Sequence, residues 1–248
     1  MQSSTILKYF SKEKEGADEK EIGSTKVMEE GSQDLKRLSK DFKRALENLR
    51  FTDVTLRVGD DEFPAHKMVL MSRSEVFERM FDSDMKENRE NVVDLVDVNA
   101  SSIKDMLFYM YTGKTEKLSV DRAMDLYVAA DRYATSGLKE VCKKIILKLI
   151  DESSVCNVAV LADLYSDEKL REAVKLVLKK NPNNIFQSQK WRDFAKERPA
   201  LYSELMESTM LDLSKERVLK PTYAPPPSSP NYEYSPVKRD FCDSDSDY

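Results

Sequence analysis

The chain has 248 residues, of which 40% are hydrophobic and 34% are charged, and its formal net charge is −5 at pH 7. This length suits one full globular domain with a smaller appendage, and the negative charge gives no basic surface for a nucleic acid partner. No apolar run approaches the ~20 residues that a membrane span needs. Residues 1–10 lack the basic start and long apolar stretch of a signal peptide, so we expect an intracellular protein without a membrane partner.

Residue types that carry catalysis or bind metals are sparse. The three cysteines, Cys142, Cys156 and Cys242, are widely spaced and odd in number. This pattern favours reduced thiols over a disulfide scaffold or a zinc site. His66 is the only histidine, and we interpret it as a structural residue at a helix start. Because nucleophile, base and metal-ligand clusters are lacking, we predict no enzyme, no cofactor and no metal.

Residues 1–32 are rich in lysine and glutamate and poor in apolar side chains, so we expect a disordered tail. Within it, Ile6, Tyr9 and Phe10 resemble the short peptide that docks on the replication sliding clamp. One helical turn would place an aliphatic plug and two aromatic rings on one side to fill a groove. The usual glutamine belongs where this chain has Ser3, and a chance apolar cluster is the alternative interpretation.

An amphipathic helix is predicted next, because apolar residues recur at three- and four-residue steps with basic residues on the other faces. The apolar positions are Leu35, Leu38, Phe42, Ala45, Leu46 and Leu49. Such a stripe is either core or interface, and periodicity does not distinguish a helix that covers its own sheet from one that packs on a second subunit.

A β-hairpin follows the helix. Residues 54–58 alternate apolar and polar side chains, and Gly-Asp-Asp at 59–61 supplies a turn. Pro64 in the second arm indicates an edge strand. From His66 the period becomes helical, with two apolar faces separated by residues 72–74, where a serine can cap the second helix.

The remaining pattern is mostly helical. The polar, loop-like segment 82–88 contains one large apolar residue, Met85, and residues 92–98 alternate as a strand. A helix closed by Gly113 is expected after that strand, and the pattern is purely helical from Glu152 to about Arg217. Six of the nine prolines lie beyond residue 220, which predicts an extended tail.

Four ordered segments of the chain resemble a BTB (POZ) domain, and the similarity is closest to the speckle-type POZ protein group. They are FTDVTLRV, FPAHKMVLMSRSEVFERMF, VVDLVDV and FYMYTGK, within a resemblance that extends from about Leu35 to about Met210. The resemblance implies an α+β fold, in which a small sheet flanked by helices is followed by an all-helical extension between disordered tails. The expected divisions are a disordered tail at 1–32, the BTB/POZ domain at 33–134, a 3-box or BACK-like helical region at 135–217, and a Pro-rich then acidic disordered tail at 218–248.

The resemblance also implies a homodimer with a two-fold interface. The amphipathic helix would supply most of that interface, and an acidic and a basic residue would lie near its seam. The expected residues are Leu35, Leu38, Phe42, Leu46, Leu49, Asp53 and Lys67. For the two charges, simple solvation is the alternative to an ion pair that fixes register.

In BTB adaptors that bind cullin-3, a hydrophobic-any-Glu triplet occupies the loop where this chain has Met85-Lys86-Glu87. An adaptable methionine can fill a pocket on the scaffold, and a glutamate can accept hydrogen bonds that fix the loop. We expect Phe81, Met85, Glu87, Tyr127 and Asp131 to form a cullin-binding site. The implied function is a substrate adaptor of a cullin-3 RING ubiquitin ligase, acting in the nucleus or cytoplasm and directing proteasomal degradation.

Two other functions stay open. A BTB unit without a substrate module could hetero-dimerise with relatives and blunt their ligase activity, or the clamp-like peptide could recruit a replication-linked scaffold. Speckle-type relatives grip substrates with a MATH domain, whereas only the tail precedes the BTB-like part here, so the substrate is unassigned. In the C-terminal tail, Ser235 lies in a proline-directed phosphorylation context, and Ser244 and Ser246 lie in an acidic one.

Overall fold

The computed structural model describes residues 24–82 and 85–219, and the structural statements below concern these residues. The clamp-like peptide (Ile6, Tyr9 and Phe10) and the candidate phosphosites (Ser235, Ser244 and Ser246) lie outside them. In chain order the elements are α2 (Ser24–Asn48), β1 (Val54–Val58), β2 (Asp61–Ala65), α3 (Lys67–Arg73), α4 (Glu75–Asp82), α5 (Lys86–Glu90), β3 (Val92–Asp94), α6 (Ala100–Thr112), α7 (Val120–Arg132), α8 (Ser136–Leu149), α9 (Val155–Leu164), α10 (Glu168–Lys180), α11 (Pro182–Phe186), α12 (Gln189–Glu197) and α13 (Pro199–Leu219). The predicted α+β class is confirmed.

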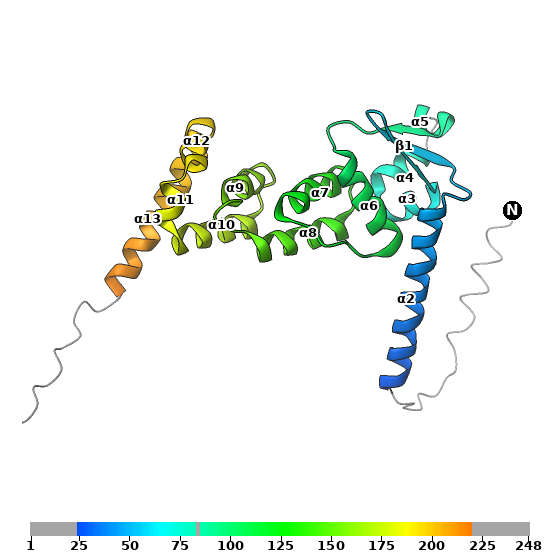
Figure 1. Ribbon diagram of the computed structural model, residues 1–248, viewed down its shortest axis with the longest axis horizontal. Coiled ribbons are helices and arrows are strands. Elements are labelled where there is room, and N and C mark those ends of the chain that lie inside the picture. Colours follow the sequence, from blue (N-terminus) through cyan, green and yellow to red (C-terminus); the bar gives the residue numbers. More distant parts are fainter. Residues whose placement is uncertain (1–23, 83–84, 220–248) are drawn as a thin grey trace, which may run out of the picture.

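A three-stranded sheet, in the order β2-β1-β3, lies at one end of the molecule (Figure 1). The central strand β1 pairs antiparallel with β2 and parallel with β3, and Leu56 stands opposite Phe63 on one side and Val93 on the other. The β2 strand is an edge, as Pro64 predicts. A proline has no N–H to offer to a further strand, so it protects this edge from pairing.

The third strand is shorter than the sequence predicts. The expected strand over 92–98 ends at Asp94, although the Leu95 N–H still donates to the Arg57 carbonyl at 2.8 Å. Asp97 then adopts a left-handed φ of 55°, which turns the chain away from the sheet toward α6. Aspartate tolerates this conformation better than most residues, because its short polar side chain bonds locally.

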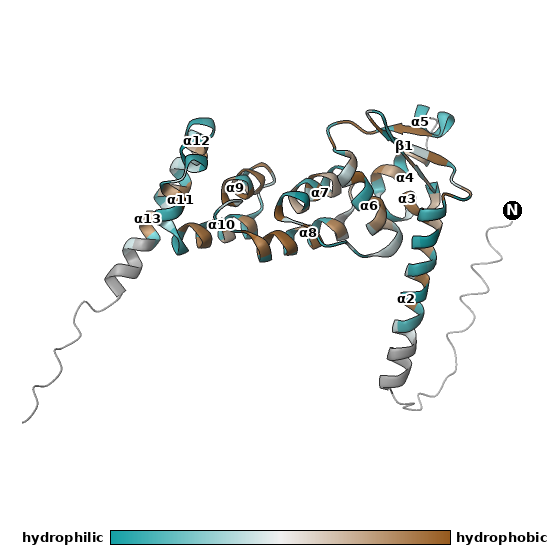
Figure 2. Ribbon diagram, viewed as in Figure 1, coloured by the Kyte–Doolittle hydropathy of each residue, from teal (hydrophilic) through white to brown (hydrophobic). Residues whose placement is uncertain are grey.

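Helices α6, α7 and α8 form the centre of the core. Their inward side chains are buried together with residues from the sheet and from α4, including Leu56, Phe77, Met106 and Leu126. Figure 2 shows that α8 contains more hydrophobic residues than the largely hydrophilic α2. The predicted helix end at Gly113 is confirmed, because this glycine has a φ of 69° and its N–H donates to the Tyr109 carbonyl at 2.7 Å.

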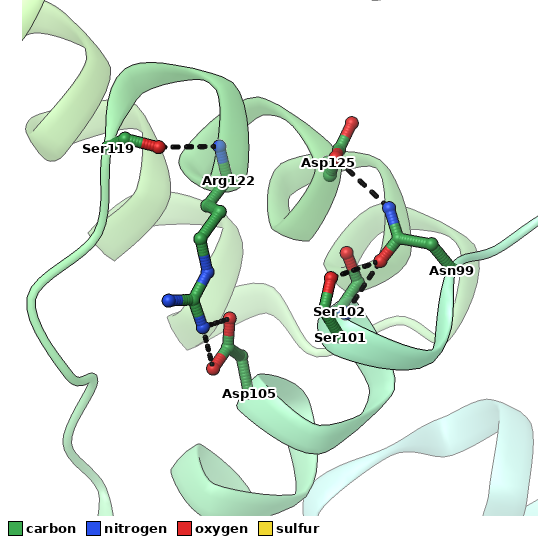
Figure 3. A network of polar contacts seen from close by, with 7 residues as sticks. All are labelled: Asn99, Ser101, Ser102, Asp105, Ser119, Arg122 and Asp125. Carbon is green, nitrogen blue, oxygen red and sulfur yellow. Dashed lines mark hydrogen bonds and ion pairs between the residues drawn. The ribbon is translucent and has the colours of Figure 1, made fainter. Parts of the chain in front are cut away.

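Polar caps fix how α6 and α7 meet (Figure 3). The Asn99 side chain accepts the Ser102 N–H at 2.7 Å and donates to the Asp125 carboxylate at 3.0 Å. The Arg122 guanidinium donates to both oxygens of the buried Asp105, at 2.7 and 2.8 Å. The Asn99–Asp125 bond joins the start of α6 to the middle of α7, and the Arg122–Asp105 pair joins the start of α7 to the middle of α6. The pair also leaves both oxygens of the buried carboxylate satisfied.

The C-terminal helices continue the core away from the sheet, so that α13 lies at the opposite end of the molecule from α5 (Figure 1). Asp167 holds the junction: its carboxylate pairs with Lys143 at 2.7 Å, accepts the Tyr127 hydroxyl at 3.1 Å and caps α10 through the Leu170 N–H at 3.3 Å. Farther along, Trp191 is buried and anchors α12. The extension is therefore packed onto α7 and α8 rather than joined by a bare linker.

Helix α2 projects from the sheet end and packs mainly against α6 (Figure 1). It begins at Ser24, so the last part of the predicted tail 1–32 is helical. The Ser39 hydroxyl donates to the Thr112 carbonyl at 2.9 Å, which fastens the middle of α2 to the end of α6. On the N-terminal side of that contact, Leu35 and Leu38 are exposed to solvent.

Candidate functional site

Residues 86–90 form the short helix α5, in a stretch where the sequence predicts a loop. Met85 occupies the N-cap position of α5 in an extended conformation, with φ −69° and ψ 159°. Its side chain is 51% exposed, which is high for a residue of this type. Glu87 follows in the first turn and is partly buried. The fold thus presents a methionine at the tip of a turn, with a carboxylate two residues further on.

Left-handed Asn91 closes this turn. It has a φ of 57°, and its N–H donates to the Glu87 carbonyl at 3.0 Å. The Asn91 carbonyl accepts the Thr55 N–H of β1 at 2.9 Å. A five-residue helix is too short to persist alone, so these tertiary bonds explain why it forms.

Lys67 and Asp53 occupy positions other than those expected of a charge pair. The Asp53 carboxylate accepts the backbone N–H of Lys67 at 2.7 Å. The Lys67 ammonium lies over the ring of Phe81, 5.2 Å from its centroid, and donates to Asn88. Within the chain, the Lys67 side chain extends toward α5 and away from the Asp53 carboxylate, and the place of the two charges at a dimer seam stays a prediction.

Two of the five expected cullin-binding residues are buried. Phe81 is 6% exposed and stacks on Phe77, and Tyr127 is 1% exposed with its hydroxyl bonded to Asp167. Burial raises the pKa of the Tyr127 phenol, so the hydroxyl stays neutral. Tyr127 supports the C-terminal junction, and its burial leaves almost no surface for the direct cullin contact that the sequence predicts.

Asp131, the fifth expected residue, is on the surface of α7 and forms an ion pair with Lys139. Lys139 in turn lies over the rings of Tyr127 and Tyr165, 5.1 and 5.5 Å from their centroids. The expected site is thus divided between an exposed part, Met85, Glu87 and Asp131, and a buried part that supports it.

A second surface runs along α2. An open groove of about 670 Å³ lies between α2, α3 and the end of α6. Leu35, Leu38 and Phe42 line it from α2, and the first two are 69% and 52% exposed. Met68 of α3 lines the same groove and is 67% exposed. Met68 is not among the interface residues predicted from the sequence, because it fits the apolar period of α3 and nothing local shows which side of that helix is covered.

The other two leucines predicted for the dimer interface lie elsewhere. Leu46 and Leu49 line a separate groove of about 560 Å³ that is bounded by β2 and by Phe108 of α6. Leu46 packs against the core, whereas Leu49 is 50% exposed. The structure therefore divides the predicted stripe into two faces, because α2 lies across α6 and leaves a groove on each side.

The connection between α2 and β1 exposes a residue that sequence analysis also missed. Phe51 is 90% exposed, and both it and Leu49 have left-handed φ values, 61° and 51°. His66 holds this turn: its Nε2 lies 2.8 Å from the Arg50 carbonyl, and its Nδ1 lies 2.7 Å from the Tyr111 hydroxyl. The interpretation of His66 as a structural residue agrees with these contacts.

The two described cysteines, Cys142 and Cys156, are buried residues of the core, and their thiols are poorly placed to react. Cys142 is fully buried, and this burial raises the pKa of its thiol to about 12. Burial also raises the pKa of the Cys156 thiol. Within residues 24–82 and 85–219, no cluster of three potential metal ligands is found. Nor does any described helix combine the length and hydrophobicity that crossing a membrane would require.

Comparisons with known proteins find a family match for the part of the chain that contains the sheet and helices α3 to α8. Residues 42–150 match the BTB/POZ domain family. A curated mouse relative, TD and POZ domain-containing protein 3 of Mus musculus, is 34% identical over 172 residues, which make up 69% of this chain and 47% of that protein. The chain thus spans about half the length of this relative. Among solved structures, the BTB domain of zebrafish PATZ1 is 26% identical, with a TM-score of 0.38, and the match covers 52% of this chain and 98% of that one.

Proposed function

We propose, on the premise that residues 42–150 form a BTB/POZ domain, that this chain is a dimeric adaptor that binds cullin-3 and brings a protein substrate to a RING ubiquitin ligase. BTB domains are protein-interaction modules, and many act as cullin-3 adaptors or dimerisation scaffolds. The proposal assigns cullin binding to the α5 turn and self-association to the groove beside α2. The bound substrate and the nuclear or cytoplasmic site of action are part of the proposal.

The observation that carries the proposal is Met85 itself. It is 51% exposed at the N-cap of α5, in the position that the hydrophobic-any-Glu triplet of cullin-binding relatives occupies. An exposed methionine on an anchored turn can enter an apolar pocket at little entropic cost, because the backbone is already fixed. Glu87 stands beside it, partly buried, where its carboxylate can accept hydrogen bonds from a partner.

Titration calorimetry of the chain against the cullin-3 N-terminal domain tests this assignment. Met85→Glu should weaken binding at least tenfold, because a carboxylate would be desolvated in an apolar pocket. Met210→Glu is the matched control: it makes the same change at a residue that is 48% exposed, on α13 at the far end of the molecule. Equal affinities of the wild type and Met85→Glu would refute the assignment.

Self-association is supported by the groove that Leu35, Leu38, Phe42 and Met68 line. Three of these four side chains are more than half exposed, and an apolar stripe of this kind favours an isologous contact with a second copy. The same groove would also accept a related BTB chain. Hetero-dimerisation that blunts a relative's ligase activity is therefore the alternative, and it predicts dimers that fail to bind cullin-3.

Recruitment to the replication clamp rests on Ile6, Tyr9 and Phe10, which lie outside the described residues. It stays a sequence-based proposal with its own test. A clamp-binding measurement on the full chain should lose its signal on Tyr9→Ala with Phe10→Ala. Unchanged binding, or no binding by the wild type, would remove the clamp from the set of partners.

A further inference from the structure

The side chain of Lys67 contacts the α5 turn. Its ammonium donates to the Asn88 side-chain oxygen at 2.9 Å and to the Asn88 backbone carbonyl at 3.3 Å. These two residues are 21 positions apart in the sequence. The contact therefore joins the start of α3 to the helix that carries Met85 and Glu87.

Helix α5 is the element that most needs such a contact. It has five residues, and helices much shorter than about 12 residues are marginal in water. The Asn88 carbonyl lies in the last turn of α5 and accepts a bond from the Lys67 ammonium. A lysine ammonium at this position bonds that carbonyl and also opposes the negative end of the helix dipole.

Lys67 is itself held in place. Its backbone N–H donates to the Asp53 carboxylate at 2.7 Å, and its ammonium lies 5.2 Å from the centroid of the Phe81 ring. Phe81 is 6% exposed and belongs to the core. The lysine is thus fixed at its backbone by Asp53, just before β1, and its ammonium is held over Phe81 of α4, so that its donors are directed to α5 before any partner arrives.

We propose that Lys67 is a positioning residue for the partner-binding turn. It caps the C-terminal end of α5, and the cap keeps Met85 and Glu87 in the arrangement that a partner meets. The identity of the partner rests on the proposed function. The role of Lys67 in the free protein does not, because the contact with Asn88 lies within one chain.

The position of Lys67 also allows its role in capping α5 to be distinguished from a role in the dimer interface. The groove that holds Leu35, Leu38 and Met68 is not lined by Lys67. A lysine at the seam would affect the dissociation of the dimer, whereas a lysine that caps α5 would affect the local opening of that helix. The two roles therefore predict changes in different measurements.

Three variants test the proposal in the full chain. Lys67→Met keeps an unbranched stem over Phe81 and removes the donors, whereas Lys67→Arg keeps donors. The control, Arg73→Met, removes the other cation of α3, whose guanidinium lies 5.4 Å from the Tyr109 ring. Amide hydrogen exchange is followed at Arg89 and Asn91, whose N–H groups bond the Met85 and Glu87 carbonyls within α5.

In the free protein, Lys67→Met should speed exchange at these amides at least about tenfold, as expected for losing a hydrogen bond to a charged group. Lys67→Arg and Arg73→Met should exchange like the wild type. The affinity of Lys67→Met for the cullin-3 N-terminal domain should fall roughly tenfold, and the dissociation constant of the dimer should stay unchanged.

Each outcome decides one point. Unchanged exchange in Lys67→Met would overturn the positioning role, and a weakened dimer with unchanged exchange would assign the lysine to the seam instead. Faster exchange in a protein whose wild type does not bind cullin-3 would retain the positioning role and reject the proposed partner. Faster exchange without loss of cullin affinity would show that α5 does not need to be held, which also overturns the proposal.

Discussion

Helices α5 and α2 both present apolar side chains to solvent, but they are anchored very differently. The five residues of α5 are tied to β1 by Asn91 and to α3 by Lys67, so the exposed Met85 sits on a fixed backbone. The 25 residues of α2 are fastened mainly along their C-terminal half, and Leu35 near the middle of the helix is 69% exposed. A short helix anchored at both ends is suited to bind a partner without changing its conformation. A long helix with one exposed apolar face is suited to pack against a helix of a second copy.

The largest effect is expected from a substitution that prevents a second copy from covering the groove beside α2. Leu38 is 52% exposed, so Leu38→Glu should leave the monomer folded. In a dimer the new carboxylate would be buried against the partner, and we expect the dissociation constant to rise roughly 100-fold. Sedimentation velocity over a dilution series measures this change.

The control for that prediction is Lys40→Gln. Lys40 is exposed on the same helix and lines neither groove, and its substitution changes the net charge by the same one unit. A Leu38→Glu protein that stays dimeric at the concentrations where the wild type does would contradict a dimer built on this groove.

A substitution at Asp167 should lower the free energy of unfolding and leave dimerisation unchanged, so it serves as a reference for the Leu38 prediction. Asp167→Ala removes the partner of the partly buried Lys143, the acceptor of Tyr127 and the cap of α10. We expect a loss of about 3 kcal/mol in the free energy of unfolding, measured in urea at pH 7. Asp94→Ala, which breaks the solvent-exposed pair with Arg57, should cost far less.

The same carboxylate gives the junction a pH dependence. Burial alone would raise the pKa of Asp167, but hydrogen bonds from Lys143, Leu170 and Tyr127 outweigh it and hold the pKa below its ordinary value. A depressed pKa stabilises the fold above the ordinary value of about 3.9, and this contribution is lost as the pH falls through the native pKa. The urea midpoint of the wild type should therefore fall below about pH 4, and Asp167→Asn should show a flatter decline.

A smaller effect is expected from the backbone of the α5 turn. Asn91 has a φ of 57°, which alanine adopts at a cost of about 1 kcal/mol and glycine adopts freely. Asn91→Ala should weaken cullin-3 binding roughly fivefold, while Asn91→Gly should bind like the wild type. If both variants bind equally well, the anchoring of α5 is not needed for docking.

The smallest effect is expected at the exposed charge pair of α5. Lys86 and Glu90 lie 3.6 Å apart, with side chains 70% and 55% exposed. Lys86→Gln should change the cullin-3 affinity less than about twofold, because exposed pairs at this spacing contribute little. A larger loss in calorimetry would mean that Lys86 touches the partner directly, which would extend the docking point beyond Met85 and Glu87.

Local chemistry explains what the sequence predicts well. The turn at 59–61, the edge position of Pro64 and the helix end at Gly113 follow from backbone preferences of single residues, and all three are present in the structure. Burial of Cys142 also follows from its place on an apolar helix face. The exposure of Met85 agrees with its isolation in a polar segment, although the one-turn helix around it was not expected.

Contacts between distant residues explain what the sequence does not predict. Tyr127 is drawn into the core by Asp167, 40 residues away, and Lys67 extends to Asn88, 21 residues away. The side of α2 on which each leucine lies depends on how the helix crosses α6. The domain boundary expected at 134 stays a prediction, while the BTB/POZ match continues to 150 and α8 packs on α7.

The central claim, a dimer that carries cullin-3 on each α5 turn, is tested most directly by the mass of the complex. Light scattering after size exclusion, with the wild-type chain and an excess of the cullin-3 N-terminal domain, should show a species that contains two copies of each. Free cullin eluting apart from an intact dimer at concentrations of about 10 μM, where a complex of micromolar affinity is substantially formed, would contradict the account.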